Sequence, residues 1–419
     1  MDYQTALDDA AARWRDGDAP GALKRLTDLS VSNPHDIRSY LEAGQIEAAL
    51  GNLLEAETWY NRACVVSDRN FWPYYLKAKL KESQHDYASC MECLTIASRQ
   101  CKNSVSDEEY TNILKYLSDV KSIVLGPSPV QLQSLLRQKN VSGKALENAV
   151  RVSLVKDEED IIYASLLSSY ENGIRFYAIA DNLSTDNTAA EIDRFIGDHP
   201  DCIVYVVRDP VVGYYQSAKT MGLTRLAVTM LEGAGKTIDW IFALDADELL
   251  HVTNHERDLH ALLSSEEMQN SQMLAYWLCH ASNSTILERV ATDDDLSTTF
   301  DTFSIHHKSP TRKVAFRNNP NALIEQGNHY CRGVASDPSQ ITIGSQHGVL
   351  LKHYPIRSIE QLRKKILNGG KALKALTVNV GGAHWKHDYD RLMARGDAYV
   401  VEKLKSYHRT NADQADGFG

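Results

Sequence analysis

Short runs of mainly apolar residues, each ending in a polar cluster, recur after the first third of the chain. The clearest runs are residues 150–155, 176–180 and 240–244. Longer stretches between them carry apolar residues at helical spacing. Short buried runs that alternate with helices are typical of the parallel strands of an α/β sheet. This part of the chain is therefore predicted to fold as an α/β domain built on an open sheet.

Charged residues follow each of these runs at once. They are Lys156, Asp157 and Glu158 after the first run, Asp181 at the end of the second, and Asp245, Asp247 and Glu248 after the third. Ligands of open α/β sheets bind just beyond the carboxyl ends of the strands. Carboxylates in that position suit a hard divalent cation that holds a diphosphate. The pattern predicts a nucleotide and metal site at one edge of the sheet.

These motifs, taken in order, resemble the family-2-like glycosyltransferases of the type-A fold. The resemblance implies a Rossmann-like α/β domain with a mixed sheet. That family carries a "KDE" loop, a "D-N-x-S-x-D-x-T" loop and a "D-x-D-E" metal site in its nucleotide half, and the resemblance covers roughly residues 148–400. It implies transfer of a sugar from a nucleoside diphosphate donor, with a UDP-sugar favoured, to a glycan or protein acceptor. Inversion at the sugar is favoured by the resemblance alone.

The metal site is expected to use Asp245, Asp247 and His353. His353 begins the segment His353-Tyr354-Pro355-Ile356-Arg357-Ser358, which is similar to an "H-Y-x-x-R-S" block of the family. Because a histidine nitrogen beside carboxylates favours manganese without excluding magnesium, Mn²⁺ or Mg²⁺ is the expected cofactor. Arg357 and Lys365, which follow in the chain, are candidates to neutralise the leaving diphosphate; the alternative is a basic, solvated helix face.

The remaining donor contacts are expected in two places. Lys156, Glu158, Asp181 and Asp245 lie at strand ends, where they would hold the nucleoside and diphosphate. Gln216 and Lys219 begin a predicted helix that runs toward Gly233. For these two residues a role in donor binding and a place in an ordinary surface loop are equally compatible with the sequence.

The acceptor side is predicted less sharply. His329 and Trp385 are candidate acceptor contacts, since an indole ring can stack on a sugar. An inverting transfer also needs a general base. Asp293, Asp295 and Glu325 are the candidates, and a solvated loop is the alternative for the first two.

A different pattern fills residues 1–125. Comparing the chain with itself after a shift of 34 residues aligns small residues: Gly17 with Gly51, Ala22 with Ala56 and Cys90, and Ala10 with Gly44 and Ala78. Small residues at a fixed period allow antiparallel helices to approach closely, as in tetratricopeptide repeats. About three repeats are predicted, followed by a helix that begins at the capping sequence Ser106-Asp107-Glu108-Glu109. The expected domains are residues 1–125, a linker at 126–149, and the transferase at 150–419.

Composition limits the partners and the cellular location that can be expected. The net charge of −10 argues against a nucleic-acid partner, and no apolar stretch reaches the roughly 20 residues that span a bilayer. The first residues lack a secretory signal pattern, and seven cysteines form no regular disulfide framework. A cytoplasmic enzyme is expected. Peripheral binding at the inner face of a membrane is an alternative form of this prediction. Its repeats would bind a protein partner or a second copy of the chain.

Two other functions remain open on the sequence. A sugar-nucleotide nucleotidyltransferase would also use a nucleotide and acidic metal ligands, but residues 152–158 contain no glycine for a phosphate loop. A tetratricopeptide scaffold with an inactive transferase domain is the non-enzymatic alternative. The presence of Asp245, Asp247 and His353 argues against it.

Overall fold

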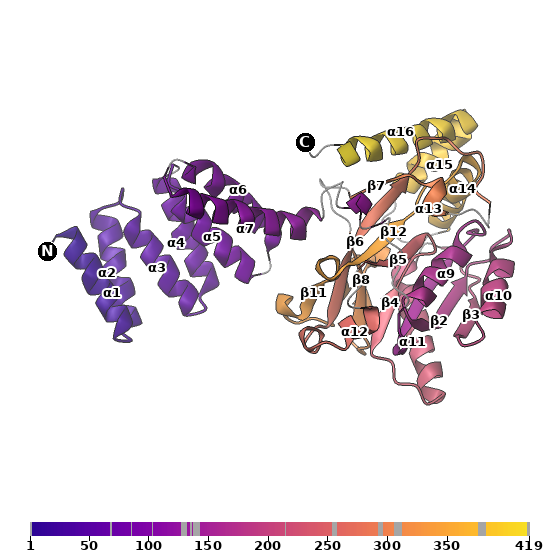
Figure 1. Cartoon of the computed structure of the whole chain (residues 1–419), viewed down its shortest axis with the longest axis horizontal. Helices are drawn as coiled ribbons and strands as arrows, with labels where there is room; N and C mark the ends of the chain where they lie inside the picture. The colour runs from indigo at the N-terminus through magenta and orange to yellow at the C-terminus, as the bar shows by residue number, and fades with distance from the viewer. Residues whose placement is uncertain are drawn as a thin grey trace. The chain divides into compact units, whose positions relative to one another are not determined.

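The computed structural model describes residues 2–67, 69–84, 86–102, 104–126, 132–134, 136, 143–213, 215–253, 258–291, 296–305, 312–375 and 383–416. They form two compact units, Met1–Val124 and Leu125–Gly419 (Figure 1). The first unit is all-helical and the second is built on a mixed sheet.

The first unit consists of tetratricopeptide-like helical repeats. Its helices are α1 (Tyr3–Arg15), α2 (Ala19–Ser32), α3 (Arg38–Ala49), α4 (Leu53–Val66), α5 (Trp72–Ser83), α6 (Tyr87–Cys101) and α7 (Asp107–Leu125). Each helix from α1 to α6 packs against the next one in the chain. Ile113 of α7 packs against Ala97 and Cys101 of α6. The prediction of helical repeats is confirmed.

The 34-residue period has a steric basis in this unit. Ala22, Ala56 and Cys90, which the period aligns, are fully buried, since each faces a neighbouring helix at close range. Gly17 and Gly51 both adopt left-handed backbone (φ 84° and 82°) in the turn after the first helix of their repeat. Only glycine adopts this conformation without a steric cost. The period therefore marks close packing and turn positions.

The predicted capping sequence begins α7. Glu109 accepts a hydrogen bond from the Ser106 backbone N–H (2.9 Å), and the Ser106 hydroxyl accepts one from the Glu109 N–H (3.3 Å). This reciprocal pair satisfies two backbone donors at the start of the helix. The sequence thus located this helix start to the residue.

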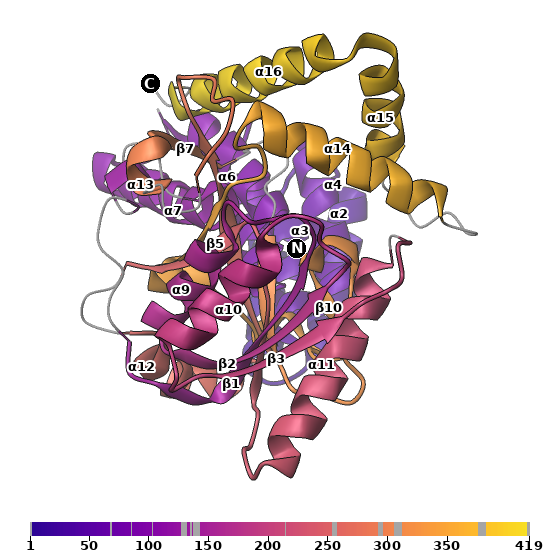
Figure 2. The same ribbon diagram turned by 90° about the vertical axis from the view of Figure 1, so that its right-hand side faces the viewer.

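The first half of the second unit alternates strands and helices. Its elements are β1 (Leu146–Val155), α9 (Ile162–Glu171), β2 (Ile174–Asp181), α10 (Thr188–Asp198), β3 (Ile203–Arg208), α11 (Gln216–Gly233) and β4 (Trp240–Ala243). These strands are parallel, in the order β3-β2-β1-β4. Helices α9 and α10 cover one face of β1 and β2, and α11 packs against the other (Figure 2). The chain reverses its direction of winding between β1 and β4, which creates a crevice at their carboxyl ends.

The other half of the sheet is antiparallel in part. Its strands are β5 (Glu248–Val252), β6 (Met273–Ser282), β7 (Thr302–Ser304), β8 (Arg312–Arg317), β11 (Ile341–Ile343) and β12 (Val349–His353). The order continues β4-β8-β6-β12-β5, with β8 antiparallel to β4 and β6, and β12 parallel to β6. β9 (Leu323–Ile324) and β10 (Cys331–Arg332) form a separate pair. The unit also contains the short helices α12 (Leu259–Leu263), α13 (Leu296–Thr299) and η2 (Gln326–Asn328).

Three helices complete the second unit: α14 (Ile359–Lys374), α15 (Ala383–Arg395) and α16 (Asp397–Asp416). Leu362 and Ile366 of α14 share a buried cluster with Leu392 of α15 and Val400 of α16. The Ser358 hydroxyl caps α14 by accepting from the Gln361 N–H. The cap fixes where α14 begins, directly after the His353–Arg357 segment.

The segment predicted as a linker, residues 126–149, is partly built into the second unit. Leu132 and Leu136 are 1% and 4% exposed and lie in one apolar cluster with Trp277 of β6 and Phe303 of β7. Strand β1 itself begins within this segment. The described part of the segment therefore contributes to the core of the sheet unit, because its leucines are the side chains that cover β6 and β7.

Candidate active site

An open cavity of about 550 Å³ lies at the carboxyl ends of β1 and β4. This is the place where open α/β sheets bind ligands, and the volume is in the range of small-molecule sites. The lining includes the predicted residues Lys156, Glu158, Gln216, Lys219, Asp245, Asp247, His329, His353, Lys365 and Trp385. Residues far apart in the sequence thus meet around one cavity.

Backbone strain gathers on the loops of this region. Among the described residues other than glycine, Asp157, Leu183 and Asn328 have left-handed backbone, with φ of 54°, 59° and 58°. They lie after β1, after β2 and at the end of η2. Each such conformation costs roughly 1 to 2 kcal/mol for a residue with a Cβ and persists where surrounding contacts hold it. The loops are therefore fixed by tertiary contacts.

A buried arginine on β1 holds the backbone of the Asp245–Glu248 motif. Arg151 of β1 is fully buried and donates hydrogen bonds to the Ser165 hydroxyl (2.7 Å) and the Asp245 carbonyl (3.4 Å). The Ser153 and Ser165 hydroxyls donate to the carbonyls of Leu244 and Glu248, both at 2.8 Å. Burial lowers the pKa of Arg151 to about 10. This network fixes the backbone from which the motif carboxylates project.

Asp245 is engaged on both oxygens by the protein itself. Its Oδ1 accepts from the amides of Gln216 and Asn328, each at 3.0 Å, and its Oδ2 accepts from Lys313 Nζ at 2.5 Å. Lys313 also lies 2.7 Å from Glu248 Oε1. Burial alone would lower the pKa of Lys313, but the two carboxylates raise it above its ordinary value. Lys313 is thus a buried ammonium shared by Asp245 and Glu248.

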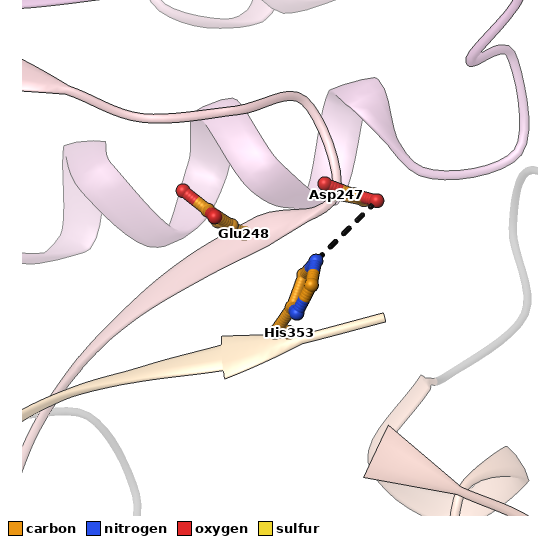
Figure 3. A group of neighbouring side chains, drawn as sticks. All are labelled: Asp247, Glu248 and His353. Atoms are coloured by element: carbon orange, nitrogen blue, oxygen red, sulfur yellow. Dashed lines mark ion pairs between the residues drawn. The ribbon is translucent and has the colours of Figure 1, made fainter. Parts of the chain in front are cut away.

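Asp247 has different partners. Its Oδ2 accepts from Lys365 Nζ at 2.6 Å and lies 3.6 Å from His353 Nε2. Burial would raise the pKa of Asp247, but the ammonium of Lys365 holds it well below its usual range. In Figure 3 the His353 ring faces Asp247, whereas the Glu248 carboxylate points away from that pair. Asp247 is therefore an ionised carboxylate beside an imidazole nitrogen.

Asp247 and His353, together with Glu248, could hold a divalent cation. One ligand atom from each of Asp247, Glu248 and His353 can be chosen so that all lie within 4.8 Å of one another. Ligand atoms that share a cation at about 2.1 Å lie roughly 3 to 4 Å apart, and the Asp247–His353 distance of 3.6 Å fits. The oxygen and nitrogen set suits Mn²⁺ or Mg²⁺. Asp245, predicted as a third ligand, is instead held by Lys313, Gln216 and Asn328.

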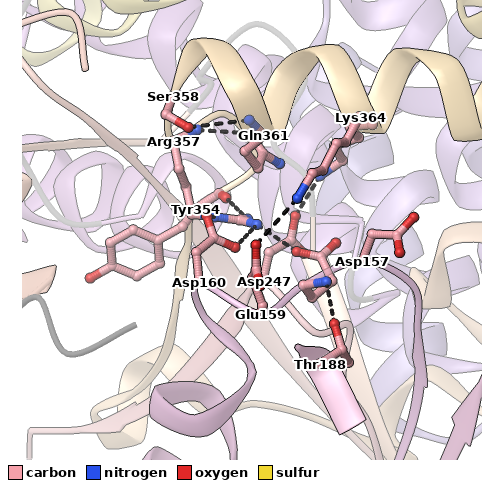
Figure 4. Close-up of polar contacts among 12 residues, drawn as sticks. Asp157, Glu159, Asp160, Thr188, Asp247, Tyr354, Arg357, Ser358, Gln361 and Lys364 are labelled. Atoms are coloured by element: carbon pink, nitrogen blue, oxygen red, sulfur yellow. Dashed lines mark hydrogen bonds and ion pairs between the residues drawn. The ribbon is translucent and has the colours of Figure 1, made fainter. Parts of the chain in front are cut away.

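The loop after β1 is tied to α14 by charged contacts (Figure 4). Arg357 is 1% exposed and contacts Glu158 at 2.5 Å and Asp160 at 2.8 Å. Lys364 of α14 lies 3.2 Å from Glu159. Burial raises the pKa of Glu158 to about 7, although Arg357 opposes the shift. The Arg357 guanidinium is therefore paired with two carboxylates and shielded from solvent, which excludes the alternative of a solvated helix face. Its contact with a diphosphate stays a prediction.

The other predicted donor residues lie on the loops after β1, β2 and β3. Lys156 donates to the carbonyls of Asn182 (3.1 Å) and Leu183 (2.9 Å), so it joins the first two loops. Asp181 accepts from the Ser184 N–H and lines a neighbouring depression at the ends of β2 and β3. Lys219 is 2.6 Å from Asp209 Oδ2. Among these three residues, Lys156 and Lys219 line the main cavity.

Glu325 and His329, which were predicted near the acceptor, have different surroundings. Glu325 forms an exposed ion pair with Arg332 at 2.6 Å. His329 is exposed, lines the cavity, and lies with Nδ1 2.8 Å from the Arg312 carbonyl. Because a carbonyl only accepts, Nδ1 carries the proton and Nε2 keeps its lone pair. Asp293 and Asp295 lie outside the described residues.

Trp385 of α15 forms part of the cavity wall. Its indole ring packs so closely on α14 that a Cβ at Gly369 would lie 2.7 Å from it. The adjacent Gly370 admits Tyr389 in the same way. Two successive glycines thus allow α15 to approach α14 and place the indole in the lining.

Three residues of the site were missed from the sequence: Arg151, Lys313 and His280. Lys313 follows Arg312 at the start of a short apolar run and carried no clear signal. Arg151, by contrast, interrupts an apolar strand run, and a charged residue inside such a run is rarely buried without a partner. That signal was present in the sequence. His280 of β6 lies with Nδ1 3.2 Å from His353 Nδ1, and it carried no comparable signal because a lone histidine in an apolar strand is common.

Solved structures that resemble this chain match its N-terminal part. No protein-family model matches the sequence, and no curated protein matches it. The chaperone SycD of Yersinia enterocolitica is 20% identical with a TM-score of 0.26, covering 28% of this chain and 82% of its own. The TPR2B domain of yeast Sti1 is 24% identical with a TM-score of 0.25, covering 28% and 96%. Both resemble the N-terminal part. Among the described residues, no helix is both long and apolar enough to cross a membrane.

Proposed function

We propose that this protein is a metal-dependent glycosyltransferase that moves a sugar from a nucleoside diphosphate donor to a glycan or protein acceptor. The observation that carries the proposal is the Asp247–His353 pair with Lys365, in a cavity at the carboxyl ends of β1 and β4. This arrangement offers two cation ligands and one ammonium group where a diphosphate would bind. A UDP-sugar is the favoured donor on the resemblance of the motifs.

In this proposal Asp247 and His353 would hold Mn²⁺ or Mg²⁺, whose charge would stabilise the leaving diphosphate. Lys365 contacts Asp247 in the structure, and its Nζ also donates to the Pro355 carbonyl at 3.0 Å. Its flexible side chain turns to a diphosphate oxygen when the donor binds. The sugar–oxygen bond then breaks, and the diphosphate leaves with the bonding electrons.

His329 accepts the proton in this reaction. Its Nδ1–H donates to the Arg312 carbonyl, so the lone pair of Nε2 is available in the cavity for the acceptor hydroxyl. The hydroxyl oxygen attacks the sugar carbon while its proton passes to Nε2. Glu325 is less suited to this role, because its carboxylate is paired with Arg332.

The rival enzyme class, a nucleotidyltransferase, needs a loop of backbone N–H groups around the phosphates. The loop after β1 presents carboxylates instead: Asp157, Glu159 and Asp160 accept hydrogen bonds or ion pairs from neighbouring loops and from α14. This loop is occupied with fixing the fold. The geometry therefore favours a glycosyltransferase over a nucleotidyltransferase.

Isothermal titration of the full chain with UDP, GDP, CDP and ATP, with and without Mn²⁺, tests the proposal. We expect one nucleoside diphosphate to bind at least about tenfold more tightly with Mn²⁺, since a cation held by Asp247 and His353 would attract the negative charge of the diphosphate. We also expect slow hydrolysis of the matching nucleotide sugar. Release of pyrophosphate from a nucleoside triphosphate and a sugar phosphate would instead identify a nucleotidyltransferase. A folded protein that binds no nucleotide would support the inactive scaffold.

The repeat unit is proposed to recruit the acceptor or a protein partner. Its core is separate from the sheet unit, and none of the cavity residues belongs to it. Residues 125–419 alone should therefore still hydrolyse the donor, while transfer to the native acceptor falls. Undiminished transfer by the shortened chain would show that the repeats have another role.

A further inference from the structure

We propose that His280 fixes the tautomer of His353 so that His353 Nε2 presents its lone pair toward Asp247, and that His280 thereby sets the affinity of the cation site. This inference rests on the proposed cation site. His280 is a positioning residue in it, because its role is exerted through His353.

The sheet places the two histidines side by side. β12 runs between β6 and β5, and His353 is paired in register with His280 on one side and with Glu248 on the other. Directly paired residues point to the same face of a sheet. The two imidazole rings accordingly lie 4.9 Å apart between centroids, with Nδ1 facing Nδ1 at 3.2 Å. His280 is 8% exposed.

A contact between two ring nitrogens has only two neutral arrangements. One nitrogen carries the proton and donates it, and the other accepts. If His353 is the donor, its Nδ1 is protonated and its Nε2 has a lone pair for a cation. If His280 is the donor, His353 carries its proton on Nε2, where it would face Asp247. A histidine that binds a metal through one nitrogen is oriented by the hydrogen bond of the other.

The surroundings of Asp247 favour the first arrangement. His353 Nε2 is 3.6 Å from Asp247 Oδ2, which is too long for a hydrogen bond that would hold a proton on Nε2. The same carboxylate oxygen already accepts from Lys365 at 2.6 Å. The short contact of His353 is the one to His280. The geometry therefore assigns the proton to Nδ1 of His353 and the accepting role to Nδ1 of His280.

Two substitutions separate the hydrogen bond from the volume of the ring. Asparagine places its amide oxygen the same number of bonds from Cα as histidine Nδ1, so His280→Asn keeps the acceptor. His280→Leu keeps a side chain of suitable size without it. By titration of the full chain with Mn²⁺, we expect His280→Leu to weaken binding by about 10- to 100-fold. His280→Asn should remain within about threefold of the unsubstituted protein, because the amide still accepts the His353 proton.

Equal affinities of the leucine variant and the unsubstituted protein would overturn the inference while leaving the cation site intact. An unsubstituted protein that binds no Mn²⁺ would overturn the cation site and this inference together. Nitrogen NMR of histidine-labelled, metal-free, unsubstituted protein gives a second measurement that does not depend on the His280 variants. His353, identified by the signal missing from His353→Gln, should carry its proton on Nδ1; a proton on Nε2 would contradict the assignment.

Discussion

The carboxylates of the Asp245–Glu248 motif fall into two groups that have different surroundings, Asp245 with Glu248 and Asp247 alone. On one side, Asp245 and Glu248 share the buried ammonium of Lys313. On the other side, Asp247 lies between Lys365 and His353 at the wall of the cavity. The difference teaches that a carboxylate in a metal-like motif can be a structural counter-ion, and that its partners decide which role it has.

The Asp245 side has a positional role in this comparison. Asp245 accepts from Asn328, whose left-handed backbone directly precedes His329. Gln216 joins the same carboxylate to the Gly327 N–H, at 3.0 Å on each contact. Asp245 thus fixes the loop that presents His329. The Asp247 side, by contrast, is the side proposed to bind the cation.

Asp247→Asn should have the largest effect on activity. It removes the ionised ligand, so we expect transfer to fall by roughly 100- to 1,000-fold and Mn²⁺ binding to be lost. Thermal unfolding should stay close to that of the unsubstituted protein. Asp193→Asn, at an exposed carboxylate of α10, is the matched control and should change neither quantity. Undiminished transfer in Asp247→Asn would remove the functional distinction between the two sides.

Lys313→Met should act on stability. It leaves Asp245 and Glu248 without their shared cation in a buried position, and breaking a buried pair in this way costs about 3 kcal/mol of unfolding free energy. Urea denaturation measures the loss. Adding Glu248→Gln to Lys313→Met should restore part of it, because the second change removes one unpaired charge. A Lys313→Met protein of unchanged stability would show that the ammonium is not a structural counter-ion.

The acidic motif and His353 were predicted from the sequence, but the contacts that Lys313 and His280 make with them were not. The strand ends, Asp247 and His353 were found because a buried run followed by carboxylates is a local pattern, and the repeats because their period is local. Lys313 is 68 residues from Asp245, and His280 is 73 residues from His353. Such contacts depend on strand order and register, since β8 and β6 must lie between β4 and β12. No local pattern specifies that order.

His329→Gln should separate the two sides by function. The glutamine removes the base Nε2 but leaves the Asp245 side folded, so we expect the rate of transfer to fall about 100-fold. Mn²⁺ affinity, measured by titration, should not change, since the cation ligands lie on the Asp247 side. Glu325→Gln is the matched control and should retain transfer, as Glu325 is engaged with exposed Arg332. A larger loss in Glu325→Gln would transfer the role of base to that carboxylate.

Lys365→Met gives the smallest and most diagnostic effect. Lys365 Nζ lies 2.6 Å from Asp247 Oδ2, so without a nucleotide its positive charge competes with a divalent cation for that oxygen. Removing the ammonium should therefore tighten Mn²⁺ binding to the nucleotide-free protein by roughly tenfold, about 1.4 kcal/mol. The same change should weaken UDP binding in the presence of Mn²⁺, because Lys365 no longer contacts the diphosphate. These opposite shifts are measured in two titrations of one variant.

Lys364→Met on the same helix, whose ammonium pairs with Glu159, is the control and should change neither affinity. Weaker Mn²⁺ binding in Lys365→Met would mean that the lysine supports the cation site instead of competing for it, and the contrast between Asp245 and Asp247 would then lie in burial alone.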